Sequence, residues 1–157
     1  MPTNLEIARN PNTSPETLAL LANDQNINVR WRVAQHSNIS PETLDILIQD
    51  KYFTISYTAA LNKNISRDLL NSLAGHSCEE IRRAVAENNA TSPEILYKLS
   101  CDKSLRVRFG VVENINAPLD VLINLIHDEN EYIRKAVFKN PSLPIEYKML
   151  YLMEKQF

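Results

Sequence analysis

Apolar residues recur along this chain in a pattern that repeats every 26 residues. In each copy two leucines lie three positions apart, and further on two smaller apolar residues lie four positions apart. Both spacings place apolar side chains on one face of a helix, so each copy predicts two short amphipathic helices. The leucine pairs are Leu18/Leu21, Leu44/Leu47, Leu70/Leu73, Leu96/Leu99 and Leu122/Leu125. The second helices are expected from Val29 to about Gln35 and from the matching positions Ile55, Ile81, Val107 and Ile133.

Serine and proline mark where the first helix of each copy begins. Ser-Pro-Glu occurs at 14–16, 40–42 and 92–94, and residues 66–68 match it without the proline. Serine caps a helix and proline fits its first position, so each first helix is expected to begin directly after the serine. Pro118 lies one position ahead of this register, and we therefore expect the fifth first helix to begin one residue early.

The segments between the helices carry two further expectations. Asparagine recurs after the second helix and tolerates the left-handed conformation that often ends a helix. We expect that conformation at Asn10, Asn62, Asn88, Asn114 and Asn140, with His36 as the exception. We expect apolar linker residues to fill the gap between the two helices of a copy, at Ile27, Phe53 and Leu105.

A helix pair copied in series predicts an all-α fold, a right-handed α-solenoid of short helix pairs. The chain is expected to form one repeat domain, 1–157, with the second helices lining its concave side. It divides into an N-terminal half-unit 1–9, five units (10–35, 36–61, 62–87, 88–113 and 114–139) and a C-terminal capping helix 140–157.

Composition narrows the class of protein. Hydrophobic residues make up 44% and charged residues 23% of the chain, as in folded soluble proteins. The net charge of −2 argues against non-specific attraction to nucleic acid or to an anionic membrane. No stretch is long and apolar enough to span a bilayer, and two cysteines are too few for a disulfide framework. We expect a cytoplasmic protein without membrane contact.

The repeated motif, D-x-x-x-x-[VI]-R-x-x-[VA]-[AV]-x-N followed by a turn and P-E-x-L-x-x-L, resembles the leucine-rich repeat variant family. The aspartate six residues before arginine is also similar to the HEAT repeat. The resemblance implies an α-solenoid that binds something and says little about what it binds. Proteins of the variant family can carry an iron–sulfur cluster in a separate cysteine-rich segment. This chain has no such segment, so no cofactor is expected.

Charged residues repeat in the same register, in two columns. The arginine column holds Arg30, Arg82, Arg108 and Arg134, with Ser56 in the remaining position. The acidic column holds Asp24, Asp50, Asp102 and Asp128, with His76 as the exception. One interpretation is a basic row that binds phosphates. The interpretation that we favour is a structural ladder, in which each arginine bridges an aspartate six residues before it or one in the adjacent unit.

No arrangement for catalysis or metal binding stands out. His76, Cys78 and Cys101 could approach one another, but no Cys-x-x-Cys motif or fourth ligand accompanies them. The histidines are scattered, and with Gly75 and Gly110 as the only glycines a phosphate-binding glycine loop is excluded. We expect no enzyme and no metal site.

The second helices offer the best candidate surface, at residue 31 and its equivalents, which are expected to face away from the core. This column changes residue type from unit to unit, as a recognition surface requires, although these aromatic residues could merely pack against neighbouring units. The expected partner-binding residues are Trp31, Arg32, Tyr57, Arg83, Arg106, Phe109, Tyr132 and Lys135.

We therefore expect a non-catalytic scaffold that binds a protein or peptide. The alternative is a nucleic-acid-binding or DNA-repair solenoid of HEAT-like type. The face around residue 31 and its equivalents carries six cations against four anions, which is weak for DNA. The C-terminal helix has too many apolar residues for one covered face, so we also expect self-association or partner docking there. Those residues are Ile145, Met149, Leu150, Leu152, Met153 and Phe157.

Overall fold

The computed structural model describes the backbone of residues 1–154 and the side chains of residues 1–149. Within these residues the chain forms twelve helices and no strand. The first helices of the repeats are α2 (Pro15–Leu21), α4 (Pro41–Ile48), α6 (Arg67–Leu73), α8 (Pro93–Ser100), α10 (Leu119–Leu125) and α12 (Ile145–Glu154). The second helices are α1 (Asn4–Arg9), α3 (Ile27–Ala34), α5 (Phe53–Leu61), α7 (Glu79–Glu87), α9 (Leu105–Glu113) and α11 (Glu131–Val137).

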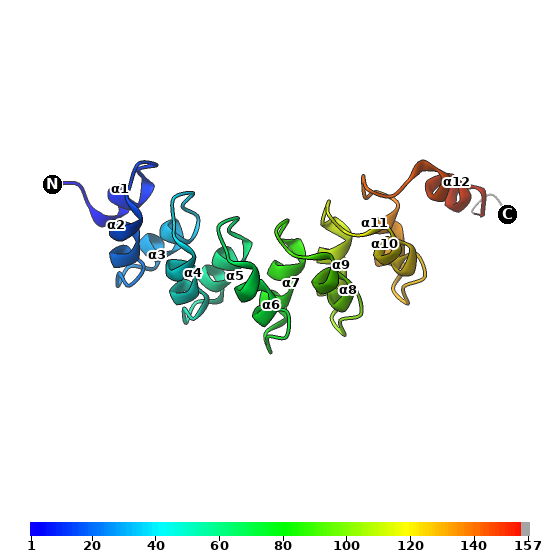
Figure 1. Cartoon of the computed structure of the whole chain (residues 1–157), viewed down its shortest axis with the longest axis horizontal. Coiled ribbons are helices and arrows are strands. Elements are labelled where there is room, and N and C mark those ends of the chain that lie inside the picture. Colours follow the sequence, from blue (N-terminus) through cyan, green and yellow to red (C-terminus); the bar gives the residue numbers. More distant parts are fainter. Residues whose placement is uncertain (155–157) are drawn as a thin grey trace.

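The helix pairs are stacked side by side into a shallow arc, with the second helices on its inner side (Figure 1). Each second helix packs against the next one along the chain, from α1 through to α11, and contacts between first helices are sparser. The predicted all-α solenoid of helix pairs is confirmed. We propose that the folded chain is divided into units at the boundaries expected from the sequence repeat.

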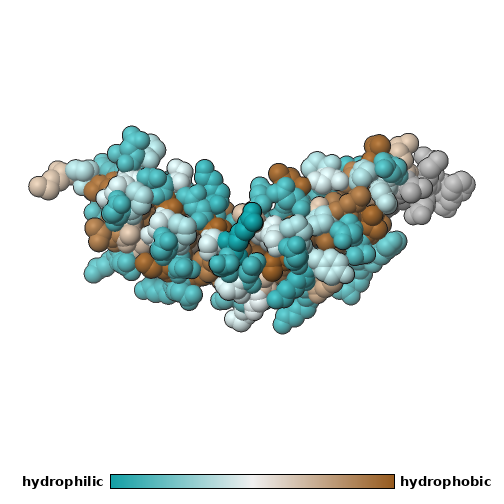
Figure 2. All heavy atoms as spheres, in the orientation of Figure 1, coloured by the Kyte–Doolittle hydropathy of each residue, from teal (hydrophilic) through white to brown (hydrophobic). Residues whose placement is uncertain are grey.

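The core is a strip between the two layers of helices. It is built from the leucine columns of the first helices and the β-branched columns of the second. Leu18, Leu44, Leu96 and Leu122 have no exposed surface, and the same is true of Ile55 and Val107. On the face shown in Figure 2, hydrophilic residues predominate, and hydrophobic residues show between them along the length of the molecule.

Three of the predicted serine caps form, and Ser92, although it precedes α8 directly, makes no side-chain cap hydrogen bond. The hydroxyl groups of Ser14, Ser40 and Ser66 each accept a hydrogen bond from the backbone N–H three residues further on, at 3.2–3.3 Å. The expectation for Pro118 was wrong: α10 begins at Leu119, in register with the other first helices, and Pro118 precedes it in an extended conformation. Burial of Leu122 and Leu125 in the common core keeps the helix in register.

The second helices begin two residues earlier than expected, at Ile27, Phe53 and Leu105. These residues do not fill a gap, because 37%, 64% and 46% of their surfaces are exposed. Each lies two positions before an inward residue such as Val29, and two steps along a helix turn a side chain to nearly the opposite face. The expectation that they plug the interior was therefore wrong.

The asparagines at the helix ends are not left-handed. Asn62, Asn88 and Asn114 have φ between −67° and −73°, and no described residue has a positive φ. Each side chain instead ties two units together. The amide nitrogen of Asn114 donates to the carbonyl oxygens of Ala86 (2.8 Å) and Asn88 (3.0 Å), and its amide oxygen accepts from the Asn116 N–H (2.8 Å).

The same contacts recur along the stack. We call this row the asparagine ladder, and it consists of Asn62, Asn88, Asn114 and Asn140. His36 takes the matching place, with its Nδ1 accepting from the Asn38 N–H and its Nε2 lying 3.0 Å from the Asn10 carbonyl oxygen. A side chain that satisfies buried carbonyl groups of the preceding unit explains why asparagine recurs here without a left-handed turn.

This ladder predicts a large effect for one asparagine and a small effect for its neighbour. Asn114→Ala should lower the free energy of unfolding by about 2–3 kcal/mol, because it removes the side-chain donor of two buried carbonyl groups and leaves that of Ala86 unpaired. Asn116→Ala removes one exposed hydrogen bond to the Asn89 carbonyl and should cost less than about 1 kcal/mol. Urea denaturation of both variants measures the difference. Equal small losses would contradict the assigned role.

Candidate functional site

Residue 31 and its equivalents form the middle column of the inner face, and the aromatic residues of this column are half-buried. Trp31, Tyr57 and Phe109 pack against the core on one side and keep part of their surfaces exposed. This column was expected to face away from the core, but its aromatic residues also contact the core. Arg30 and Ala34 are buried as well as Val29, so the buried side of each second helix is wider than the valine stripe suggested.

Tyr57, Arg83 and Glu87 form a cluster that joins α5 to α7. The Arg83 Nε donates to Glu87 Oε1 at 2.6 Å, and the Tyr57 hydroxyl donates to the other carboxylate oxygen. The guanidinium lies 5.9 Å from the centre of the Tyr57 ring. Burial, with the hydrogen bond to Glu87 adding to it, raises the pKa of Tyr57 to about 12. Arg83 is thus already neutralised by Glu87, a partner four residues on that the sequence analysis did not assign.

The other expected contact residues lie in separate places on the surface. The Arg32 guanidinium lies 4.9 Å from the centre of the Trp31 ring, at the N-terminal end of the inner face. Arg106 stands apart from the row, with 63% of its side chain exposed and its Nη1 at 3.8 Å from the Glu79 carboxylate. Lys135 lies 3.2 Å from Glu131 on its own helix.

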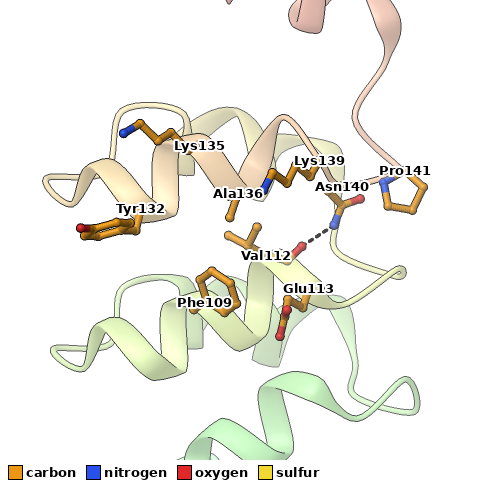
Figure 3. Close-up of a pocket in the computed structure, with 9 residues that line it drawn as sticks. All are labelled: Phe109, Val112, Glu113, Tyr132, Lys135, Ala136, Lys139, Asn140 and Pro141. Carbon is orange, nitrogen blue, oxygen red and sulfur yellow. Dashed lines mark hydrogen bonds between the residues drawn. The ribbon is translucent and has the colours of Figure 1, made fainter.

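Phe109, Tyr132 and Lys135 meet at a groove of about 520 Å³ between α9 and α11. Figure 3 shows Phe109, Val112 and Glu113 on α9 facing Ala136 on α11 and Lys139 in the turn directly after it. The floor is apolar and the rims carry charged side chains, which is the usual make-up of a site for a small apolar group with a polar neighbour. Val112, Ala136 and Pro141 line it as well and were not among the predicted residues, because their sequence positions look like ordinary helix packing.

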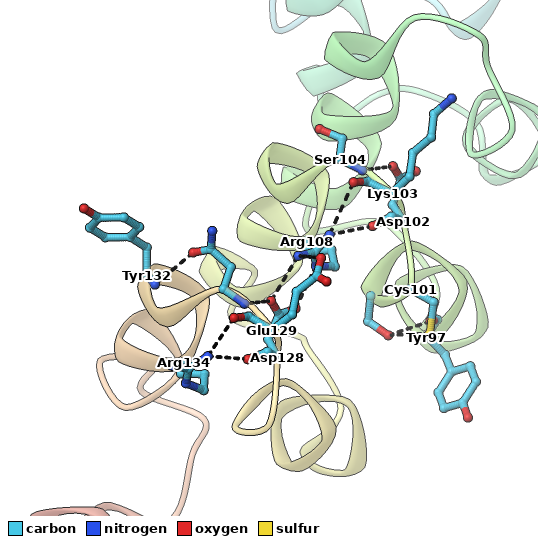
Figure 4. A network of polar contacts seen from close by, with 12 residues as sticks. Tyr97, Cys101, Asp102, Lys103, Ser104, Arg108, Asp128, Glu129, Tyr132 and Arg134 are labelled. Atoms are coloured by element: carbon cyan, nitrogen blue, oxygen red, sulfur yellow. Dashed lines mark hydrogen bonds and ion pairs between the residues drawn. The ribbon is translucent and has the colours of Figure 1, made fainter. Parts of the chain in front are cut away.

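Three of the arginines in the structural ladder hold adjacent units together. The Arg108 Nε donates to Asp128 Oδ2 at 2.7 Å and its Nη2 donates to Oδ1 at 3.0 Å (Figure 4). Its Nη1 donates to the carbonyl oxygen of Asp102 at 2.9 Å. The aspartate six residues before the arginine therefore contributes its backbone, and the aspartate in the next unit contributes its carboxylate. The same pairs form between Arg30 and Asp50 and between Arg82 and Asp102.

These ion pairs are buried. The side chains of Arg108 and Asp128 are 8% and 5% exposed. Burial alone would raise the pKa of Asp128, but the hydrogen bonds from Arg108 and from the Asn130 N–H outweigh it, so the pKa lies below its ordinary value. A guanidinium that is enclosed in this way is not available to bind phosphate groups.

The two ends of the ladder are different. Arg134 donates to the carbonyl oxygens of Asp128 (2.6 Å) and Glu129 (2.9 Å). In the other pairs the carboxylate comes from the residue twenty positions after the arginine. For Arg134 that residue is Glu154, whose side chain lies outside the described residues. At the other end the Asp24 carboxylate accepts from the Asn4 side chain at 2.6 Å, and Asn4 stands where the register would place an arginine.

The ladder is interrupted at one described junction, between α5 and α7. Ser56 takes the place of the arginine and its hydroxyl donates to the Asp50 carbonyl at 3.0 Å. His76 takes the place of the aspartate, and its Nδ1 accepts from the Cys78 N–H at 3.1 Å. Both members of the pair are thus replaced together. A cavity of about 250 Å³ lies at this junction, and its lining includes Ser56, His76, Cys78 and Phe53.

The cysteines do not form a site within the described residues. The Cys78 Sγ donates to the Glu80 carboxylate at 3.0 Å, and Cys101 is exposed in the next unit. No group of three potential metal ligands occurs among the residues whose side chains are described. The part of the chain that the structure describes also contains no helix long and apolar enough to cross a membrane.

The C-terminal helix α12 exposes apolar side chains. Ile145 and Met149, on α12, are 68% and 52% exposed. The side chains of the other apolar residues named for self-association lie outside the described residues. They are Leu150, Leu152, Met153 and Phe157.

Among solved structures, the chain is similar to one described as a leucine-rich repeat variant with a novel repetitive protein structural motif. The TM-score is 0.65 and the identity is 25%, over 93% of this chain. The resemblance inferred from the repeated motif is confirmed. The chain spans 58% of the length of that structure. No protein-family model and no curated protein matches the sequence.

The ladder predicts unequal losses for two arginines that are two residues apart. Arg108→Ala should lower the free energy of unfolding by about 3 kcal/mol or more, since it leaves the buried Asp128 carboxylate unpaired. Arg106→Ala, at an exposed pair, should cost less than about 1 kcal/mol. Thermal and urea denaturation provide the comparison.

Acid should reduce the deficit of Arg108→Ala. Because the pair lowers the pKa of Asp128, its stabilisation is present above about pH 4 and is lost as the pH falls through the lowered pKa. The difference in unfolding free energy between the wild type and Arg108→Ala should therefore shrink as the pH falls below about 4. A deficit that stays constant as the pH falls would contradict a role for the charged carboxylate.

The interrupted junction predicts a favourable coupling between two substitutions. Ser56→Arg with His76→Asp should restore the ladder, whereas either change alone introduces a charged group without its partner. A double-mutant cycle should give a coupling energy of about 2 kcal/mol, as expected for hydrogen bonds between charged groups. Additive effects of the two substitutions would show that the junction cannot accept the ladder geometry.

Proposed function

We propose that this chain is a non-catalytic repeat scaffold that holds a protein or peptide partner on its inner face. The observation that carries this proposal is the half-buried aromatic row on the second helices. Trp31, Tyr57 and Phe109 are held in place by the core and still offer surface to a ligand. Aromatic side chains that are already fixed lose little entropy on binding, and they supply much of the energy of protein interfaces.

The same face carries the other proposed contact residues, Arg32, Arg83, Tyr132 and Lys135, with Arg106 nearer its edge. The row is aromatic at its N-terminal end and becomes more basic towards Lys135. An extended segment with apolar side chains and some acidic groups suits this mixture. The two free cysteines suit a reducing setting such as the cytoplasm.

A uniform polyanion fits the face less well. Arg83 is paired with Glu87 and Arg106 with Glu79, so two of the cations on or beside the row are already countered. Binding to nucleic acid depends on a dense set of free cations and weakens steeply with salt. Measuring DNA binding at two salt concentrations therefore distinguishes the nucleic-acid alternative from the proposed function.

The proposal predicts that partner binding depends on Trp31 and not on an aromatic residue of the outer layer. A partner can be captured with the whole chain from the native cell and identified by mass spectrometry. Trp31→Ala should then weaken its binding by about 2 kcal/mol, as for an interface hot spot. The matched control is Tyr97→Ala, on the first helix α8, where the side chain is 53% exposed.

Calorimetric titration of the purified partner measures both variants, and thermal melts verify that each is folded. Loss of binding in Tyr97→Ala with normal binding in Trp31→Ala would move recognition to the outer layer. Tight, salt-sensitive DNA binding would replace the proposed function with the nucleic-acid alternative.

A further inference from the structure

The groove between α9 and α11 exists because the packing of the second helices changes at that place. α7 and α9 pack more extensively than any other pair of helices. A Cβ at Gly110 would lie 3.1 Å from the Ala86 Cβ and 3.3 Å from the Arg83 carbonyl oxygen, closer than most side-chain contacts, so glycine favours this close approach. The two helices are consequently packed closely on the inner surface.

One unit further on, the matching pair of residues is larger. Val112 takes the register position of Ala86, and Ala136 takes that of Gly110. The contact between α9 and α11 is less extensive than that between α7 and α9, and Val112 and Ala136 both line the groove. The extra volume of these two side chains thus accounts for the space in which Phe109 and Tyr132 are accessible.

The charges around this groove are unbalanced. Lys139 lines it and makes no ion pair with any described residue. Lys135 also lines it and forms an ion pair with Glu131, which lies outside the groove. The acidic side chain on the opposite rim is Glu113, which also faces Arg83. The α11 rim therefore has positive charge to offer to a ligand, directly beside an apolar floor.

We propose that this groove is the anchoring site of the inner face and that it takes an acidic peptide segment. The segment places one bulky apolar side chain between Phe109, Val112 and Ala136, and carries an aspartate or glutamate close by in sequence for Lys139. This assignment rests on the proposed function and adds the chemistry of the ligand. Arg83 is not part of this anchor, because its guanidinium is already paired with Glu87.

Selection of short random peptides displayed on phage, against the whole immobilised chain, provides the probe. A selected peptide is then synthesised with a fluorophore, and its Kd is measured by anisotropy. Lys139→Glu reverses the rim charge at an exposed position, and Ala136→Trp fills the floor. Lys98→Glu is the matched control, because Lys98 is an exposed lysine on the outer helix α8.

We expect the selected peptides to combine an apolar residue with a nearby aspartate or glutamate. Their binding should weaken about tenfold or more in Lys139→Glu and in Ala136→Trp, and stay unchanged in Lys98→Glu. A second selection against Lys139→Glu should enrich lysine or arginine in place of the acidic residue. Because Lys139→Glu alters only an exposed side chain, this second selection remains informative even if Ala136→Trp unfolds.

Two negative results have different meanings. Peptides that lose affinity in Trp31→Ala but bind both groove variants normally would overturn the anchoring site and leave the proposed function standing. Failure to select any peptide, or selection of peptides that bind all three variants normally, would overturn the anchoring site and the proposed function together.

Discussion

The structure depends on how the turns between its helices satisfy their backbone carbonyl groups. Every short helix ends with carbonyls that have no partner within the helix, and in a stack of helix pairs many of them are buried. Here side chains of the neighbouring unit or of the same turn supply the donors. The Asn114 amide reaches two carbonyls of the preceding unit, and the Arg108 guanidinium reaches the carbonyl of Asp102 while it binds the Asp128 carboxylate.

These two rows make their contacts at the turns, where they leave the inner face free for other uses. Because the asparagine and arginine contacts fix how each unit follows the last, the middle column of the second helices need not repeat. It changes from Trp31 through Tyr57 and Arg83 to Phe109 and Lys135. Small changes in packing between second helices then decide where neighbouring helices approach closely, as at Gly110, and where a groove lies between them, as at Val112.

The 26-residue period was sufficient to predict the helix pairs, their core residues and the solenoid, because burial of the leucine columns repeats with the sequence. Features that depend on the distance between units could not be predicted from the repeat pattern. The period places an aspartate both six residues before Arg108 and twenty residues after it, and only the stacking geometry decides which carboxylate is bound. Likewise, the contacts of Asn114 with the preceding unit cannot be read from a local preference for turns. The groove arises from side-chain volume at Val112, which looks like any other buried valine in the sequence.

The central claim is that the ladders hold the stack while the inner face binds the partner. Backbone amide chemical shifts of the isotope-labelled chain, recorded during titration with a bound peptide, test it most directly. The account predicts shift changes along α9 and α11, with the amides of the first helices α4 and α6 and of the turns at Asn62 and Asn88 unchanged. Changes concentrated on the first helices or on those turns, with α9 and α11 unaffected, would contradict it.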